Sequence, residues 1–286
     1  MSDIREVSVD ELRHLVSDRA MTGETMLLNM GPQHPSTHGV LRLLLELEGE
    51  IVLNCIPDIG FLHTGVEKNM EAKTYQKAEV MTDRLDYLNP MGNNLIFSMA
   101  VEKLVDLDVP PRAQALRVIL SELQRVASHL VWIGTSSLDL AAMSVFLYAM
   151  REREMILNVF EMVSGARMMT TYIRPGGLWR DVPDGFDPAV REILEVLPRR
   201  IDEYESMLTK NELFLDRTRK IGVISTDQCK QYGLTGPVIR ATGLAYDLRK
   251  ARPYNGYEQY DFHVPTQTGG DVYARYLVRR QGVPPS

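Results

Sequence analysis

The pattern of apolar and polar positions changes from strand-like to helical along the chain. From Thr25 to Pro57 β-forming residues dominate, and Val40–Leu47 and Ile51–Ile56 flank the turn Glu48-Gly49-Glu50, which predicts a β-hairpin. From about Val66 onward, apolar residues recur at three- and four-residue steps, the spacing of a helix with one buried face. The pattern therefore predicts a small N-terminal β-region followed by long helices.

The two longest helical patterns lie in the middle of the chain. In Arg112–Trp132 an apolar stripe follows a pair of prolines, and Gly134 is predicted to end the helix. A second helix is predicted over Leu138–Ser164. Up to Met150 it is apolar on nearly every side, which is typical of a helix buried in the middle of a bundle.

The C-terminal half is more irregular. Ile173–Phe186, rich in Gly, Pro and Asp, predicts a connection. An amphipathic helix is predicted over Pro188–Leu208, and Pro198 is expected to kink or divide it because proline has no amide hydrogen for the helical ladder. From Gly222 onward the sequence predicts short helices, turns and a strand near Gln259–Val264.

The end of the sequence looks like the start of a helix, Tyr273–Arg280, that breaks off in Gln281–Ser286, and this predicts a truncation or a frame change. The fold class predicted is α+β, mainly α, in four parts. Residues 1–24 are an N-terminal extension, 25–65 the β-region, 66–172 a core helical bundle, and 173–286 a helical and irregular C-terminal part.

Composition narrows the function classes. With 286 residues, 44% of them hydrophobic, the chain can bury a sizeable core. Its net charge of -6, with both signs mixed throughout, provides no basic stripe and argues against a nucleic-acid partner. Cys55 and Cys229 are too few to hold an iron–sulfur cluster of the four-cysteine kind, so none is expected on this chain.

Two segments bear on targeting and membranes. Met1–Thr25 has acidic residues and no apolar stretch of the kind found in secretory signals. Leu138–Met150 is the most apolar run, and it is shorter than the roughly 20 residues that span a bilayer. A chain that is soluble, or peripheral on a membrane complex, is expected.

His34 and His38 lie in a segment, Gly31–Gly39, whose glycines and prolines predict a loop. Histidines four residues apart can bind zinc from one face of a helix, but Pro35 and the loop remove that geometry and no nearby glutamate completes a metalloprotease pattern. One remaining interpretation is a structural loop whose histidines hydrogen-bond to the backbone. The other is proton exchange with a substrate, because imidazole titrates near neutral pH.

Quinone reduction is a reaction that such a loop would serve. It consumes two electrons and two protons, and a histidine at one carbonyl and a phenol at the other would stabilise the reduced oxygens. Tyr87, in Arg84–Asn89 at the end of a predicted helix, is the candidate phenol, and ordinary packing is the alternative. Asp139, at the start of the predicted apolar helix, would either cap that helix or pair with an imidazole and raise its pKa.

Other ionisable residues have plainer interpretations. His63 and Glu67 fall where a glycine-containing loop runs into a helix, and His63 is expected to be structural. His129 lies one step off the apolar face of its helix, which favours packing or an interhelical hydrogen bond over metal binding. The charged run Arg151–Glu154 is typical of a solvated helix face or of local ion pairs, and a buried network within an assembly is the alternative.

The most distinctive segments of the chain are Gly31–Arg42, Gly60–Lys68, Arg84–Tyr87, Glu122–His129 and Tyr246–Lys250. Together they resemble the 49 kDa, or D, subunit of the proton-pumping NADH:quinone oxidoreductase, respiratory complex I. The resemblance implies that His38 and Tyr87 hold the quinone headgroup and that Asp139 pairs with His38. It gives supporting positions to His34, His63, Glu67 and Arg84.

That family is in turn similar to the large subunit of nickel–iron hydrogenases, which hold their metal with two Cys-x-x-Cys pairs. Here the segment that resembles the first pair reads Asp86-Tyr-Leu-Asn89 and has no thiolate, whereas a soft nickel–iron centre needs those sulfurs. The resemblance implies a hydrogenase-like fold whose former metal cavity takes an organic substrate. No metal is expected on this chain.

The resemblance also implies an enzyme that works only as part of a complex. Electrons would arrive from the terminal iron–sulfur cluster of a partner subunit, and NADH and FMN would bind in other subunits. Further partners implied are the 30 kDa-type subunit and the membrane-arm subunit at the quinone entrance. The location implied is the cytoplasmic face of a bacterial membrane, or the matrix side in an organelle. Because family members continue well past the position of Arg279, a non-catalytic scaffold or truncated remnant is the alternative.

Overall fold

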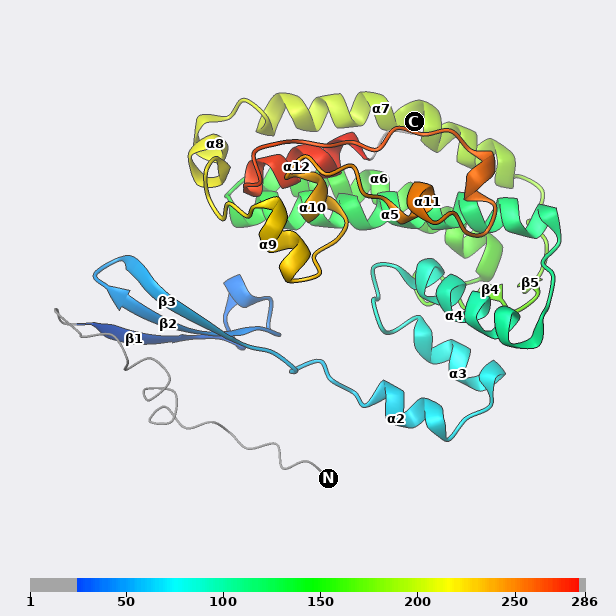
Figure 1. The fold of residues 1–286 in the computed structure, drawn as a ribbon. Helices are drawn as coiled ribbons and strands as arrows, with labels where there is room; N and C mark the ends of the chain where they lie inside the picture. The colour runs from blue at the N-terminus through cyan, green and yellow to red at the C-terminus, as the bar shows by residue number, and fades with distance from the viewer. Residues whose placement is uncertain (1–24, 283–286) are drawn as a thin grey trace. The chain divides into compact units, whose positions relative to one another are not determined.

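We describe residues 25–282 in a computed structural model of the chain. The chain divides into two compact units, residues 1–66 and 67–286, and each is described by itself. Figure 1 shows the elements of both.

The first unit contains a three-stranded antiparallel sheet in the order β1 (Met26–Met30), β2 (Arg42–Glu48), β3 (Ile51–Asp58). The predicted hairpin is confirmed as β2 and β3. Leu44, Leu45 and Leu47 of the central strand are buried, whereas most of β3 is exposed. The loop between β1 and β2 holds a short 3-10 helix, η1 (Pro35–Thr37).

The second unit is built on long helices. It contains α3 (Tyr75–Thr82), α4 (Pro90–Val105), α5 (Pro111–Asp139), α6 (Met143–Ser164) and α7 (Phe186–Leu208), and α2 (Val66–Glu71) begins at the boundary between the units. α6 packs against α5 on one side and α7 on the other (Figure 1). Fully buried side chains from α5 and α6, among them Leu120, Leu130, Ile156 and Phe160, form the core. The mainly helical fold class with a small N-terminal sheet is confirmed.

Gly134 does not end α5, and that prediction is wrong. The helix continues for five more residues, and this glycine lies inside it, where side chains of α6 pack against it. A Cβ atom at Gly134 would lie 3.3 Å from the ring of Phe146 and 3.5 Å from Cβ of Ala149. The glycine allows close approach of the two helices, which offsets its cost of about 1 kcal/mol in a helix interior.

The second long helix begins later than predicted. Leu138 and Asp139 form the last turn of α5, and the chain reverses over Leu140–Ala142 before α6 begins. Asp139 therefore lies at the C-terminal end of a helix and not at a helix start. The expectation of burial on every side is also wrong for the first turns of α6, where Met143 and Leu147 are 60% and 58% exposed.

Two further predictions concern the next segments. The connection Ile173–Phe186 contains a small hairpin, β4 (Ile173–Arg174) and β5 (Gly177–Leu178). Pro198 does not divide α7, which is continuous. The carbonyl that loses its helical partner there belongs to Leu194, which is exposed, so water can satisfy it.

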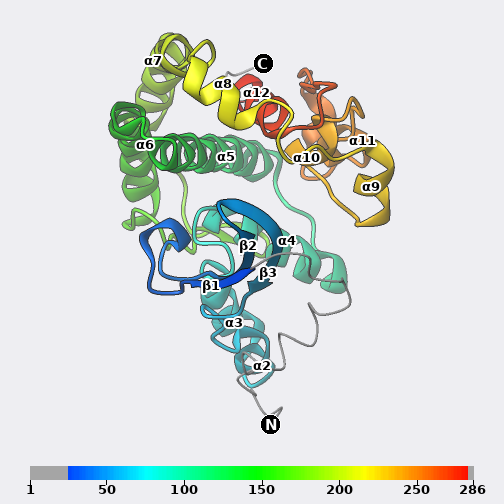
Figure 2. The ribbon, with the colours of Figure 1, turned by 90° about the vertical axis from the view of Figure 1, so that its left-hand side faces the viewer.

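The remaining elements are short: α8 (Glu212–Thr218), α9 (Thr226–Gln231), α10 (Pro237–Arg240), α11 (Leu248–Ala251), η2 (Tyr257–Gln259) and α12 (Val272–Gln281). The predicted strand near Gln259–Val264 is wrong: this segment has no strand partner among residues 25–282. The predicted C-terminal helix is confirmed as α12, which packs against α5, α8 and α10 (Figure 2).

Candidate functional site

The loop between β1 and β2 is held in shape by the buried side chain of Thr37. Its Oγ1 donates hydrogen bonds to the carbonyls of His34 (2.8 Å) and Pro32 (3.3 Å). Gly31 has a φ of 94°, and a Cβ atom there would lie 2.2 Å from the carbonyl oxygen of Leu41. Glycine is therefore required where the loop begins.

The two histidines of this loop have different positions. The Nδ1 atom of His34 accepts a hydrogen bond from the backbone amide of Ser36 (3.2 Å), so this ring caps η1. His38 ends η1 in the left-handed conformation, with a φ of 53°, and its side chain is exposed. His34 has a structural task in the loop, and His38 presents an imidazole at the surface of the first unit.

His63 and Glu67 lie on the segment that leads out of the sheet. The Nδ1 atom of His63 accepts a hydrogen bond from the amide of Gly65 (3.2 Å), which stabilises the turn before α2. Glu67 is exposed in the first turn of α2, where the helix dipole favours an acidic residue.

Tyr87 lies in the loop that joins α3 to α4, residues 83–89, a few residues beyond the helix end. The loop is anchored at several points. Gln124 of α5 donates a hydrogen bond to the carbonyl of Leu88 (2.8 Å), and Asn93 of α4 donates one to the carbonyl of Asp86 (2.9 Å). The guanidinium of Arg84 donates a hydrogen bond to the carbonyl of Val80 (2.6 Å). Tyr87 is 49% exposed, so an anchored loop presents this residue at the surface.

Asp139 is exposed at the last residue of α5. An acidic group at the C-terminal end of a helix is disfavoured by the helix dipole, so helix capping does not explain it. His38 belongs to the first unit, and Tyr87 and Asp139 belong to the second. The pairing of His38 with Asp139, and the placing of His38 opposite Tyr87, stay predictions.

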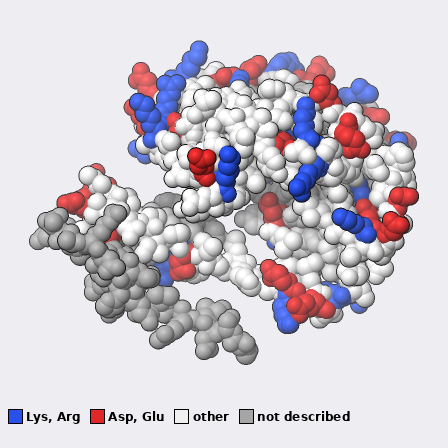
Figure 3. Space-filling view, viewed as in Figure 1, with Lys and Arg blue, Asp and Glu red and all other residues white. Residues whose placement is uncertain are grey.

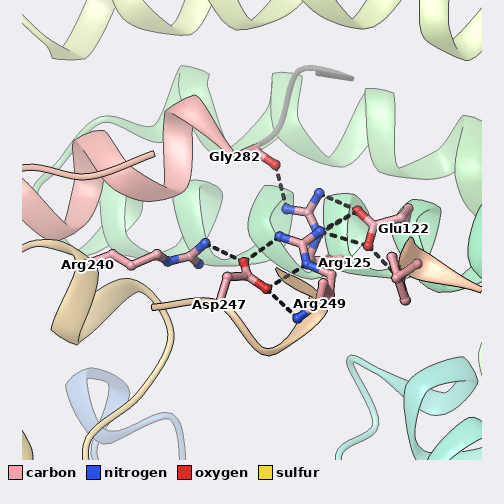
Figure 4. Close-up of polar contacts among 7 residues, drawn as sticks. Glu122, Arg125, Arg240, Asp247, Arg249 and Gly282 are labelled. Carbon is pink, nitrogen blue, oxygen red and sulfur yellow. Dashed lines mark hydrogen bonds and ion pairs between the residues drawn. The ribbon is translucent and has the colours of Figure 1, made fainter. Parts of the chain in front are cut away.

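A cluster of ion pairs that the sequence did not reveal connects α5 to the C-terminal segments (Figure 4). Arg249 lies between two carboxylates: it donates to Glu122 (2.9 and 3.1 Å) and to Asp247 (2.7 and 3.0 Å). Arg125 donates to Glu122 (2.5 Å) and to the carbonyl of Gly282 (2.5 Å). Arg240 donates to Asp247 (3.0 Å).

The charges in this cluster fix the protonation states around it. Burial acts to raise the pKa of Glu122, but the neighbouring Arg125 and Arg249 outweigh it and hold that pKa below its usual value. Burial, together with repulsion from Arg125 and other nearby arginines, lowers the pKa of His129 to about 3. His129 is therefore neutral at physiological pH.

A cavity of about 370 Å³ lies beside this cluster within the second unit. Asp86 and Asn89 of the Tyr87 loop line it, together with Arg240, Tyr246 and Asp247. Its wall thus includes both ends of the segment Asp86–Asn89.

Within residues 25–282, no group of three or more His, Cys, Asp or Glu side chains is placed to hold a metal ion. Nor does any helix in that range have both the length and the apolarity needed to cross a membrane. On the face of the second unit seen in Figure 3, acidic and basic side chains are interspersed.

Comparison with known proteins decides the family. The model of the family described as "Respiratory-chain NADH dehydrogenase, 49 Kd subunit" matches residues 139–286. The chain belongs to this family.

Relatives in the 49 kDa subunit family are similar over most of the chain. It is 64% identical over 256 residues to the D 2 subunit of NADH-quinone oxidoreductase from Chloroflexus aurantiacus, a match that covers 90% of this chain and 62% of the relative. The D 2 subunit from Roseiflexus sp. is also 64% identical, with 90% and 61% covered, and the D subunit from Geotalea uraniireducens is 56% identical, with 90% and 66% covered. The chain thus spans about 62% of the length of the first of these relatives.

The ion-pair cluster is what sequence reasoning missed within this family's motifs. Glu122 and Arg125 are spaced three apart on α5, and Asp247 and Arg249 lie in another motif segment. The only sign of the cluster in the sequence was that both of these motif segments carry charges of opposite sign. The pairing itself, across more than a hundred residues, is not visible in the sequence.

Proposed function

We propose that this chain forms part of the quinone-reduction site of an NADH-quinone oxidoreductase complex. Family membership supports the reaction, since the relatives carry that name. The single structural observation that carries the proposal is the loop of residues 83–89, which is anchored to α4 and α5 and presents Tyr87 at the surface.

The loop offers what a quinone headgroup requires. Leu85 is 56% exposed beside Tyr87 and supplies an apolar surface for the ring. The Tyr87 hydroxyl donates a hydrogen bond to one quinone oxygen, where negative charge develops during reduction. His38 serves the other oxygen, because its imidazole is exposed on a loop held in shape by Thr37.

Asp139 pairs with His38 in this proposal, because a carboxylate stabilises the protonated form of an imidazole beside it. The electrons come from an iron–sulfur cluster of a partner subunit, and NADH and FMN bind elsewhere in the complex.

The remaining features of the proposal concern the fold and the assembly. A hydrogenase-like origin is supported by the 370 Å³ cavity, because Asp86 and Asn89, at the positions of a former cysteine pair, line it. The complex translocates protons, and this subunit sits peripherally on the cytoplasmic side of the membrane, beside the terminal-cluster and 30 kDa-type subunits and the membrane-arm subunit at the quinone entrance.

A photoreactive quinone analogue tests the proposal in the assembled complex. Peptide mapping is expected to find label in residues 83–89 and in the η1 loop, and excess unlabelled quinone is expected to suppress it. Labelling confined to other subunits would refute the proposal. The exposed surface of α7 provides an internal control that should stay unlabelled.

A second candidate function is that of a scaffold that binds neighbouring subunits without contacting quinone. The observation that favours it is a run of exposed apolar side chains in and after β3, at Ile51, Val52, Leu53, Ile59, Phe61 and Leu62. Such a surface marks a protein contact. Co-purification with partner subunits, with no quinone-competed label on this chain, would favour the scaffold.

A further inference from the structure

A buried polar track runs between α3 and α4 directly beneath the Tyr87 loop. On α4, Asn94, Ser98 and Glu102 follow one another at four-residue steps, so they share one face of the helix. They are 0%, 0% and 7% exposed. On α3 and its C-cap, Glu79 and Asp83 are also four residues apart and are 3% and 0% exposed.

Hydrogen bonds hold the α3 and α4 sides of the track together. The amide nitrogen of Asn94 donates to Oγ1 of Thr82 (2.9 Å), and that hydroxyl donates to the carbonyl of Glu79 (2.7 Å). Asp83 accepts a hydrogen bond from the amide of Thr171 (3.1 Å) and another from its hydroxyl. These bonds join α3 to α4 at Thr82 and Asn94 and fix the side chain of Asp83 against Thr171.

Three polar atoms of this track lack a hydrogen-bond partner among residues 25–282: Oε1 of Glu79, Oδ1 of Asn94 and Oγ of Ser98. Buried polar groups in folded proteins are almost always satisfied, by protein atoms or by ordered water. Three orphans on facing sides of one helix pair point to a shared internal water, which typically makes about three hydrogen bonds.

In the part of the chain that the structure describes, the charges around Glu79 leave it without an ion pair. Arg117 of α5 is fully buried, but its guanidinium is taken up by Glu102 (2.5 and 3.2 Å) and by two backbone carbonyls. Arg174 of β4 donates to the carbonyl of Thr171. Asp83, four residues further along the chain, carries a charge of the same sign and disfavours a negative charge on Glu79.

We propose that Glu79, Asn94 and Ser98 hold an internal water, and that Glu79 stores beside it a proton for quinone reduction at the Tyr87 loop. The evidence for the storage site is the burial of these three side chains and their three polar atoms without a hydrogen-bond partner. Delivery of the proton to quinone rests on the proposed function. Burial, opposed by Arg174 and reinforced by Asp83, raises the pKa of Glu79 to about 7, which suits a group that exchanges protons at neutral pH.

The O–H bond of the Glu79 carboxylic acid breaks, and the proton passes through the internal water to a reduced quinone oxygen at the Tyr87 loop, which begins at Asp83. Glu79 becomes a carboxylate, and its proton is one of the two that the quinone takes up with two electrons. Those electrons come from the partner subunit's iron–sulfur cluster. Glu79 regains a proton from solvent before the next turnover.

Infrared spectroscopy and the Glu79→Gln substitution test the storage site without any need for quinone turnover. The carbonyl stretch of a buried carboxylic acid is expected in the wild-type chain, to titrate with a midpoint near 7, and to be missing from E79Q. Ser98→Ala keeps the carboxyl but removes a water ligand, and is expected to shift that midpoint upward. The matched control Glu71→Gln removes an exposed carboxyl and should leave the band unchanged. Absence of the band in wild type would overturn the proposal.

Delivery is tested in the assembled complex by the pH profile of quinone reduction. The rate of quinone reduction by the wild-type complex is expected to fall as pH rises through about 7. The E79Q complex is expected to be about tenfold slower than wild type below that pH and to show no such fall. Reduction of an artificial acceptor by NADH should not change. An unaltered quinone profile in E79Q would overturn delivery. If the Tyr87→Phe complex also reduces quinone at the wild-type rate, the proposed function is refuted, and so is proton delivery to quinone. The infrared experiment tests the storage site independently of that result.

Discussion

Replacing Glu79 with glutamine should make the chain more stable at alkaline pH but not at acidic pH. The carboxyl is 3% exposed, and its pKa is about 7 in the folded chain against 4.5 in an unfolded one. Between those values the folded chain binds the proton more tightly, so wild-type stability falls as pH rises from about 4.5 to about 7 and is then constant. The difference corresponds to about 3 kcal/mol, at 1.36 kcal/mol per pH unit.

Glutamine has the shape of the glutamic acid side chain but no ionisable proton, so it should remove the pH-dependent contribution of Glu79 to the stability. Urea unfolding followed by circular dichroism is the assay, with wild type and E79Q compared at pH 5 and pH 8. The stability difference between the two is expected to move by about 2–3 kcal/mol in favour of E79Q between these conditions, since a small part of the change lies below the lower pH. The exposed control Glu71→Gln should stay within about 0.5 kcal/mol of wild type throughout. A difference between E79Q and wild type that is equal at both pH values would refute the reasoning.

Three further substitutions test the packing. Arg117→Met should cost about 3–5 kcal/mol in urea unfolding because it leaves Glu102 buried without its partner, and a cost below about 1 kcal/mol would show that the pair is not desolvated. Gly134→Leu should cost about 1–3 kcal/mol because it forces α5 from α6, whereas an unchanged Tm would mean that the helices can separate freely. Thr37→Val should lower protection of the η1 loop amides in hydrogen exchange, since about 1 kcal/mol of hydrogen bonding is lost; equal protection would contradict the anchoring role.

Local patterns could be predicted from the sequence where one physical cause dominates. The hairpin of β2 and β3 follows from β-forming residues around a glycine turn, and α12 from its periodicity. The end of α5 could not be predicted from Gly134, because glycine can end a helix or can allow a second helix to approach closely. Only the position of α6 distinguishes the two roles. Asp139 was misplaced for a related reason: the apolar run around it continues across a chain reversal at Leu140–Ala142.

Interactions between distant segments could not be predicted in this way. Glu122 and Arg249 are 127 residues apart, and neither sequence neighbourhood shows that they pair. Glu79 lies in a weakly amphipathic helix and has the pattern of an ordinary surface residue, yet it is 3% exposed in the folded chain. Among the candidate site residues, Tyr87 stays a prediction, and the anchoring of its loop by Gln124 could not be read from the sequence.

The most direct test of the central claim is the ratio of quinone reduction to artificial-acceptor reduction in a complex that carries Tyr87→Phe. Phenylalanine keeps the ring and removes only the hydroxyl. Quinone reduction is predicted to fall on the order of tenfold or more, with acceptor reduction unchanged, since the proton donor is lost. Tyr75→Phe, which alters a tyrosine that is 61% exposed on α3, should leave both activities intact. A ratio in Tyr87→Phe equal to that of wild type would contradict the account.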